Sequence, residues 1–391
     1  MPELESLRGI ACLAVLLLHS FAWQYSGLLK FSKIPQLILK VTQPGNFGVN
    51  LFFVLSGFLI TGILVDTREA EGYFKNFYAR RCLRIWPLYA SLIVFMFVIV
   101  PLVRPSETRT VFDKSSPWWA YPLFLQNFLV ANPTGAAGPL AVTWSLAIEE
   151  QFYLVWPWIV RYYSLAHLRR LAIGVIGLSP ALRLYLSFHG VNLYTNVFCR
   201  LDGLMAGAFL ALFIRSDTLL PSRFVPSAWI VLAVSVPLAF ATEAVDARWI
   251  VFSLSAVASA SFVYLALFST HVWLQGALTN RFVVYTGTIS YALYLLHKIP
   301  FDMAKTFHLE RHPLLAFPIL LAACYAMAAL SWNLLEQPFL KLKQYFDTKP
   351  AVPGRANRGL AARREHRSKR PAPPSPHRAP RRPTDRSPAP L

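Results

Sequence analysis

Residues 10–21 read Ile10-Ala-Cys-Leu-Ala-Val-Leu-Leu-Leu-His19-Ser-Phe21, an apolar run typical of a membrane-spanning helix that nevertheless carries a titratable side chain. Burying an ionisable group in hydrocarbon is costly, so such a residue usually faces a protein interior and has a function there. His19 is therefore the first candidate functional residue. It indicates chemistry within a membrane.

The composition of the whole chain agrees with this interpretation. Of 391 residues, 55% are hydrophobic and only 15% are charged, and the mean hydropathy is +0.44, whereas an ordinary soluble domain is roughly 25% charged. Windows long enough to cross about 30 Å of hydrocarbon predict an all-α, polytopic membrane protein with about ten transmembrane helices. The predicted spans are 7–23, 46–65, 83–103, 143–160, 171–188, 197–213, 228–242, 249–269, 282–301 and 313–335.

Alternate loops between these spans are rich in Lys and Arg, as cytoplasmic loops are. This pattern predicts that both termini face the cytoplasm. We expect two parts, an integral-membrane domain over 1–345 and a disordered, Pro- and Arg-rich tail over 346–391. From Lys341 onward the chain has 14 basic and 3 acidic residues, a charge that favours contact with anionic membrane lipid over a specific nucleic acid.

The helical rise of about 1.5 Å per residue gives each polar residue a depth. His19 falls slightly beyond the midplane, and Glu149 and Glu150 fall at nearly the same level on another helix, so a histidine and a carboxylate are expected to meet. His297 and Asp202 fall in the same outer half. His297 could equally be a structural hydrogen-bonding residue, and Asp202 could form an ion pair with its neighbour Arg200.

Arg80, Arg81 and Arg84 stand at the cytoplasmic start of the third predicted span, where guanidinium groups on one helix face suit phosphate oxygens. The alternative is charge that sets the topology and reaches lipid head groups. The four cysteines have neither metal-ligand nor disulfide spacing, so we expect packing residues and no metal.

Several motifs occur together in order: Leu7-Arg-Gly-Ile10 leading to His19; Gly48-Val-Asn-Leu-Phe-Phe-Val-Leu-Ser56-Gly57; Arg80-Arg81-Cys-Leu-Arg84-Ile-Trp-Pro87; Trp144-Ser145-Leu-Ala-Ile-Glu149-Glu150-Gln-Phe-Tyr153; Asp202-Gly203; Tyr294-Leu-Leu-His297; and Glu336-Gln-Pro338. Over residues 3–340 the chain resembles the integral-membrane acyltransferase 3 family. That resemblance implies a bacterial inner-membrane enzyme that moves an acyl group, commonly acetyl from acetyl-CoA, onto a hydroxyl of a sugar, polysaccharide or macrolide.

The resemblance also implies roles for these residues. Arg81 and Arg84, with Arg80 beside them, would hold the phosphates of acyl-CoA. His19 would be the general base, or less readily an acyl-histidine, oriented by Glu149 or Glu150, of which Glu150 is favoured. The acceptor pocket would be lined by Ser56, Trp144, Ser145, Tyr153, Asp202 and His297.

Two other functions stay open at this point. A transporter or flippase of an acylated or sugar-containing substrate could use the same histidine and carboxylates as a proton relay. A non-catalytic membrane protein could use its basic tail to recruit lipid or protein partners. For an acyltransferase, the expected partners are acyl-CoA, a carbohydrate, glycan or macrolide acceptor, membrane lipid and glycan-assembly proteins.

Overall fold

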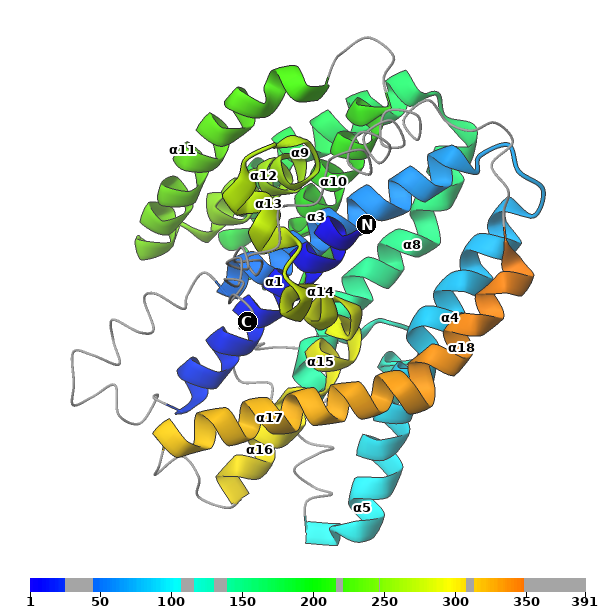
Figure 1. The fold of residues 1–391 in the computed structure, drawn as a ribbon, viewed down its shortest axis with the longest axis vertical. Helices are drawn as coiled ribbons and strands as arrows, with labels where there is room; N and C mark the ends of the chain where they lie inside the picture. The colour runs from blue at the N-terminus through cyan, green and yellow to red at the C-terminus, as the bar shows by residue number, and fades with distance from the viewer. Residues whose placement is uncertain are drawn as a thin grey trace, which may run out of the picture. The chain divides into compact units, whose positions relative to one another are not determined.

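The computed structural model describes residues 1–24, 45–106, 116–129, 139–215, 221–245, 247–306 and 313–347, all within one compact unit, Met1–Val352. The regular secondary structure of these residues is entirely helical (Figure 1). This confirms the predicted all-α class for the part of the chain that is described. The predicted tail lies outside the described residues, apart from positions 346 and 347.

The helices follow one another along the chain. They are α1 (Pro2–Gln24), α3 (Gly45–Asp66), α4 (Tyr73–Val94), η2 (Phe95–Ile99), α5 (Val100–Val103), η3 (Trp118–Ala120), α7 (Gln126–Leu129), η4 (Pro139–Val142), α8 (Thr143–Tyr162), α9 (Leu165–Ser187), η5 (Val197–Cys199), α10 (Leu201–Ile214), η6 (Pro221–Phe224), α11 (Val225–Ala244), α12 (Arg248–Phe268), α13 (Val272–Leu278), α14 (Arg281–Thr288), α15 (Ser290–Leu296), α16 (Lys298–Thr306), α17 (Pro313–Ser331), η8 (Trp332–Glu336), α18 (Gln337–Lys341) and η9 (Leu342–Phe346).

Among the described residues, six helical stretches are long and apolar enough to cross a membrane. They are Phe47–Asp66, Tyr73–Val103, Leu165–Ser187, Ser222–Glu243, Trp249–Phe268 and Ala316–Phe346. In Ser222–Glu243 only 11% of the most apolar window is buried inside the protein, so its hydrophobic side chains must be covered by lipid. The chain is a multi-pass membrane protein, and these six stretches agree with six of the predicted spans in position, length and composition.

The remaining predicted spans agree with the observed helices to different degrees. Helices α1 and α8 lie where spans are predicted, and α10 is apolar but shorter, at 14 residues. The prediction of one continuous helix over 282–301 is wrong, because α14, α15 and α16 follow one another with breaks at Ile289 and His297. Pro300 contributes to the second break, since it has no N–H to donate to the carbonyl of Leu296 and its ring crowds that carbonyl.

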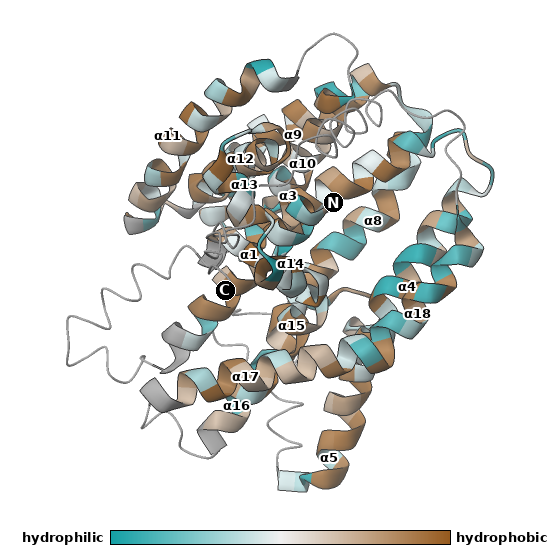
Figure 2. Ribbon diagram, in the orientation of Figure 1, coloured by the Kyte–Doolittle hydropathy of each residue, from teal (hydrophilic) through white to brown (hydrophobic). Residues whose placement is uncertain are grey.

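Helix α4 begins at Tyr73, ten residues before the predicted start, so Arg81 and Arg84 lie inside the helix. Helix α18 packs beside it. Figure 2 shows hydrophilic residues gathered on α4 and α18, whereas α5, which continues the same helical stretch beyond η2, is hydrophobic. The hydrophilic residues of this long helical stretch therefore lie towards its α4 end, and its α5 end is hydrophobic.

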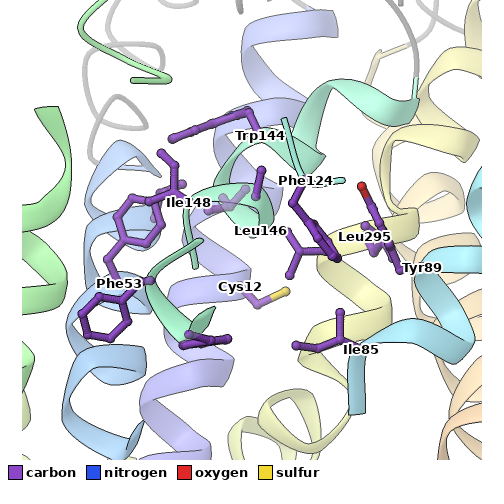
Figure 3. Packing of buried hydrophobic residues seen from close by; sticks show 14 of the residues in the cluster. Cys12, Phe53, Ile85, Tyr89, Phe124, Trp144, Leu146, Ile148 and Leu295 are labelled. Atoms are coloured by element: carbon purple, nitrogen blue, oxygen red, sulfur yellow. The ribbon is translucent and has the colours of Figure 1, made fainter. Parts of the chain in front are cut away.

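Helix α3 is the centre of the packing and contacts α1, α8, α10 and α12. A Cβ atom on Gly57 would meet the carbonyl oxygen of Leu204, and one on Gly207 would meet that of Val54. The backbones of α3 and α10 therefore touch, as small residues allow in membrane helices. On its other side α3 joins a cluster of buried apolar residues from several helices, which Figure 3 shows around Cys12, Phe53, Ile85, Tyr89, Phe124, Trp144, Leu146, Ile148 and Leu295.

Candidate functional site

His19 is paired with His297. The Nδ1 atom of His19 lies 2.8 Å from the Nε2 atom of His297, and the two rings are nearly parallel, at 12°. His297 is buried, with 1% of its surface exposed, and its ring stands edge-on to Phe301. The pair joins α1 to the break between α15 and α16, two segments that are 278 positions apart in the sequence.

The other ring nitrogen of His297 decides where the protons of the pair lie. Its Nδ1 atom is 2.6 Å from the backbone carbonyl of Tyr294, which can only accept a hydrogen bond. In the neutral pair, Nδ1 of His297 therefore carries its proton, and its Nε2 atom accepts from Nδ1–H of His19. The Nε2 atom of His19 is left without a proton. It is a free base.

A cavity of about 310 Å³ runs between α1, α3, α4, α8, α15 and η9. Its volume is at the lower end of the range for small-molecule pockets. Ser56, Glu149, Tyr153, Ser145 and Tyr294 provide polar groups along its wall. His19 and His297 are not lining residues, but Tyr294 belongs to both features, since its side chain lines the cavity and its carbonyl holds His297.

The cationic end of the cavity is lined by Arg8, Arg81, Arg84 and Lys343. The Arg81 guanidinium lies 5.3 Å from the ring centre of Tyr153 and 5.8 Å from that of Phe77. One terminal nitrogen of Arg84, Nη2, is buried without a hydrogen-bond partner. Buried donors of this kind generally have partners, so this end of the cavity suits an anionic ligand.

Arg80 lies apart from this cluster. It donates to Asp347 at 2.7 Å and to the backbone carbonyl of Phe346 at 3.5 Å, and it does not line the cavity. Arg80 thus attaches η9 to α4, while the neighbouring arginines Arg81 and Arg84 face the cavity.

The two glutamates do not meet His19. Glu149 accepts a hydrogen bond from Ser56 and lines the cavity, and Glu150 has a buried oxygen without a partner and does not line it. The expected pairing of a glutamate with His19 does not occur, because a similar depth in the membrane does not determine which faces of two helices point towards each other. The face of α8 that carries Glu149 packs on α3. Helix α1 packs on α14 and α15 as well as on α3, so the side chain beside His19 is that of His297, the residue after α15.

Ser145 lies at the cavity wall with its hydroxyl 2.7 Å from that of Tyr294. Tyr153 lines the cavity beside Arg81. Trp144 lies outside the cavity, packed against Phe53 and Tyr194 and 5% exposed. Ser145 and Tyr153 are therefore placed to contact a ligand in the cavity, while Trp144 supports its wall.

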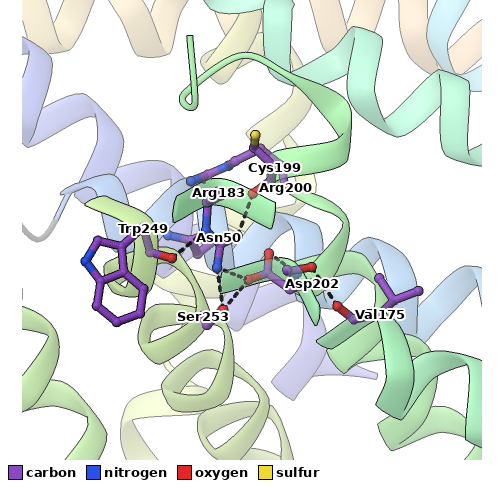
Figure 4. A network of polar contacts seen from close by, with 10 residues as sticks. Asn50, Val175, Arg183, Cys199, Arg200, Asp202, Trp249 and Ser253 are labelled. Carbon is purple, nitrogen blue, oxygen red and sulfur yellow. Dashed lines mark hydrogen bonds and ion pairs between the residues drawn. The ribbon is translucent and has the colours of Figure 1, made fainter. Parts of the chain in front are cut away.

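Asp202 belongs to a separate buried network (Figure 4). It forms an ion pair with Arg183 at 2.9 Å and accepts a hydrogen bond from Ser253 at 2.6 Å. The Arg183 side chain is completely buried and also donates to the backbone carbonyls of Trp249 and Cys199. The ion-pair partner of Asp202 is thus Arg183, and Arg200, the partner considered from the sequence, lies 3.9 Å from the ring centre of Phe252. This network joins α9, α10 and α12.

Three cations were given no role from the sequence: Arg8, Arg183 and Lys343. Arg183 lies in an apolar span between residues 171 and 188, and an intramembrane charge is itself a signal that the residue has a partner. Lys343 offers no such signal, because it stands among the many basic residues that follow Lys341. Within the described ranges, no group of three or more His, Cys, Asp and Glu side chains could hold a metal ion.

Comparison with known proteins gives matches over most of the chain. A family described as an acyltransferase domain matches residues 1–334. A Staphylococcus aureus (strain MSSA476) protein named "Putative O-acetyltransferase" is 26% identical over 370 residues, which cover 87% of this chain and 57% of that protein. The peptidoglycan O-acetyltransferase OatA of Listeria monocytogenes is 32% identical over 167 residues, 40% of this chain and 24% of that protein.

A Bacillus subtilis protein named "Putative peptidoglycan O-acetyltransferase YrhL" is 33% identical over 186 residues, covering 44% of this chain and 26% of its own length. The chain thus spans little more than half the length of the staphylococcal relative and about a quarter of the other two. No solved structure matches the chain.

Proposed function

The chain belongs to the acyltransferase 3 family, and we propose that it transfers an acetyl group from acetyl-CoA to a hydroxyl of a cell-envelope glycan. The observation that carries this proposal is the free Nε2 atom of His19, held by His297 near a cavity with a cationic end. The names of the relatives from Listeria and Bacillus, both peptidoglycan O-acetyltransferases, favour a glycan acceptor.

The cationic end and the base are separated by a distance that suits a long donor. Arg8 lines the cavity, and His19 follows eleven residues later on the same helix α1, which corresponds to about 16 Å of rise. A coenzyme A thioester is a linear molecule with phosphates at one end and the reactive carbonyl at the other. With its phosphates at Arg8, Arg81 and Arg84, it would extend along the cavity towards the histidine pair.

The chemistry follows from the proton arrangement. Nε2 of His19 takes the proton of the acceptor hydroxyl as its oxygen attacks the thioester carbonyl. When the carbon–sulfur bond breaks, the imidazolium returns that proton to the CoA thiolate. His297 accepts the Nδ1–H hydrogen bond throughout, so it orients His19 and stabilises its charge, which is the role the sequence assigned to a glutamate. Direct transfer of the acetyl group to the acceptor is the simpler route, and transfer through an acyl-histidine intermediate is the alternative.

Ser145 and Tyr294 line the cavity, and their hydroxyl oxygens lie 2.7 Å apart. The backbone carbonyl of Tyr294 also accepts a hydrogen bond from His297. We assign these two hydroxyls as donors to the oxygen of the thioester carbonyl as negative charge develops on it. Glu149 and Ser56 also line the cavity, and Glu149 acts electrostatically on Arg81, so these two residues would contact the arm of the donor.

We place the cationic end of the cavity at the cytoplasmic face of a bacterial inner membrane, with ten spans and both termini inside. The excess of Lys and Arg in alternate loops supports this orientation. The acetyl donor would then enter from the cytoplasm, and the glycan would approach from the opposite side.

The test uses membranes that contain the full chain, radiolabelled acetyl-CoA and a pooled extract of cell-envelope glycans. We expect the wild-type protein to label glycan. His19→Ala should abolish labelling, and Arg84→Met should raise the KM for acetyl-CoA by about tenfold or more, since a charge-assisted contact to phosphate is lost. Lys75→Met is the matched control, because Lys75 is an exposed cation on α4 that does not line the cavity.

Full labelling by correctly inserted His19→Ala protein would contradict the proposal. A wild-type protein that leaves acetyl-CoA untouched but moves a solute across the membrane would favour the transporter alternative.

A further inference from the structure

Lys343 is the one cavity-lining residue that comes from the C-terminal helix η9. It faces the same cavity as three arginines of α1 and α4. Helix η9 packs on α4 and is attached there by Arg80, which binds Asp347 and the carbonyl of Phe346. The position of Lys343 is therefore built into the fold.

The charge around Lys343 is unusual. The groups that act most strongly on its ammonium are all cations: Arg84, Arg81, Arg80 and Arg8. Glu149 is the one carboxylate among the lining residues, and it already accepts a hydrogen bond from Ser56. The arginines have carboxylates near them: Arg8 pairs with Glu5 and Arg80 with Asp347, and glutamates act on Arg81 and Arg84. Among the described residues Lys343 has no such ion pair, and a cation placed among like charges without a counter-charge of its own is unfavourable. The cluster is thus suited to a ligand that carries several negative charges.

A diphosphate ester carries about two negative charges and would match two of the four lining cations. A phosphomonoester adds about two more at neutral pH. Coenzyme A has both groups, a diphosphate and a 3′-phosphate on its ribose. Its diphosphate can contact the arginines while its 3′-phosphate remains for Lys343, whereas a donor without the 3′-phosphate leaves Lys343 without an anionic partner.

The two kinds of cation suit the two kinds of phosphate. Arginine has a planar fork that binds oxygens in pairs, and lysine is a compact charge on a flexible stem. Arg81 is fixed between the rings of Phe77 and Tyr153, whereas Lys343 approaches from a separate helix and can reach a group at the far end of the donor.

We propose that Lys343 binds the ribose 3′-phosphate and makes the protein selective for coenzyme A thioesters over donors without that phosphate, such as dephospho-CoA thioesters. This inference rests on the proposed acyl-CoA donor, and it adds a determinant of donor choice.

The experiment measures binding and transfer separately on the purified full chain in detergent. Binding of CoA and of dephospho-CoA is measured for the wild type, Lys343→Met and Lys343→Arg. The control is Lys341→Met, since Lys341 is exposed and does not line the cavity. We expect the wild type to bind CoA about tenfold or more tightly than dephospho-CoA, as loss of one charge-assisted contact predicts.

In Lys343→Met the preference should fall to near one, through weaker binding of CoA with little change for dephospho-CoA. Lys343→Arg and Lys341→Met should keep the preference. Equal binding of both molecules by the wild type, an equal loss for both in Lys343→Met, or no binding of CoA would each overturn the assignment.

Transfer with acetyl-CoA on the same preparations tests the proposed function independently. A protein that prefers CoA through Lys343 but transfers nothing would keep the assignment of Lys343 and contradict the enzyme. Transfer with equal KM from both donors would keep the enzyme and contradict the assignment.

Discussion

Replacing His297 with leucine removes the acceptor of the Nδ1–H hydrogen bond of His19 and leaves an apolar side chain in its place. The bond is 2.8 Å long and its acceptor is 1% exposed, so water cannot easily substitute for it. A buried donor without a partner costs about 1–3 kcal/mol. If the orientation of His19 matters only in the transition state, this cost appears as a reduction of kcat by about 10- to 100-fold.

The KM for acetyl-CoA should stay within about twofold, because the phosphates would bind at Arg8 and its neighbours, about 16 Å along α1 from His19. His297→Gln is the informative second variant, since its amide oxygen can accept the same hydrogen bond. It should retain clearly more activity than His297→Leu. Both variants are measured with radiolabelled acetyl-CoA at saturating and limiting donor, after a check that they elute and melt like the wild type.

The reasoning would be refuted if His297→Leu kept the wild-type kcat, or if kcat and KM changed together. A glutamine variant no better than leucine would show that acceptance from Nδ1–H is not the role of His297.

Two further substitutions test the scaffold. Gly57→Leu should sharply reduce the folded yield, because its side chain would enter the backbone of α10 at Leu204, whereas Gly174→Leu, where nothing lies within 4 Å, should fold normally; thermal melting in detergent compares the two, and equal stability would contradict the packing. Asp202→Asn should lower the melting temperature, since breaking a buried ion pair costs about 3–5 kcal/mol, and it should leave the KM for acetyl-CoA unchanged in the surviving protein. A change of KM without a change of stability would place Asp202 in the donor site.

The sequence indicates which titratable residues lie within apolar helices, but it does not determine which of them meet. Apolar windows located the helices, and titratable groups within them marked His19, Glu149 and His297. Their partners depend on helix tilt and rotation, which tertiary packing sets. Glu149 therefore meets Ser56 and His19 meets His297, although His19 and Glu149 lie at nearly the same predicted depth.

Composition does not predict which of the last residues of the membrane domain, expected to end at residue 345, line the cavity. The charge count from Lys341 onward is that of a solvated tail, and charge counts contain no information on docking. Yet Leu342–Phe346 is helical and Asp347 is bound by Arg80, so the first residues of that basic segment are attached to α4, and Lys343 lines the cavity.

The break in the predicted ninth span explains why His297, an ordinary buried residue by its sequence, could control a base. Helix α15 ends at Leu296, and the last carbonyls of a helix have no partner within it. The carbonyl of Tyr294 is one of these, so it is free to accept from Nδ1–H of His297. In an uninterrupted helix that carbonyl would be occupied by the backbone N–H of Lys298, and the proton positions of the pair would be undetermined. The break in the helix, which the periodicity of the sequence does not predict, therefore leaves Nε2 of His19 unprotonated.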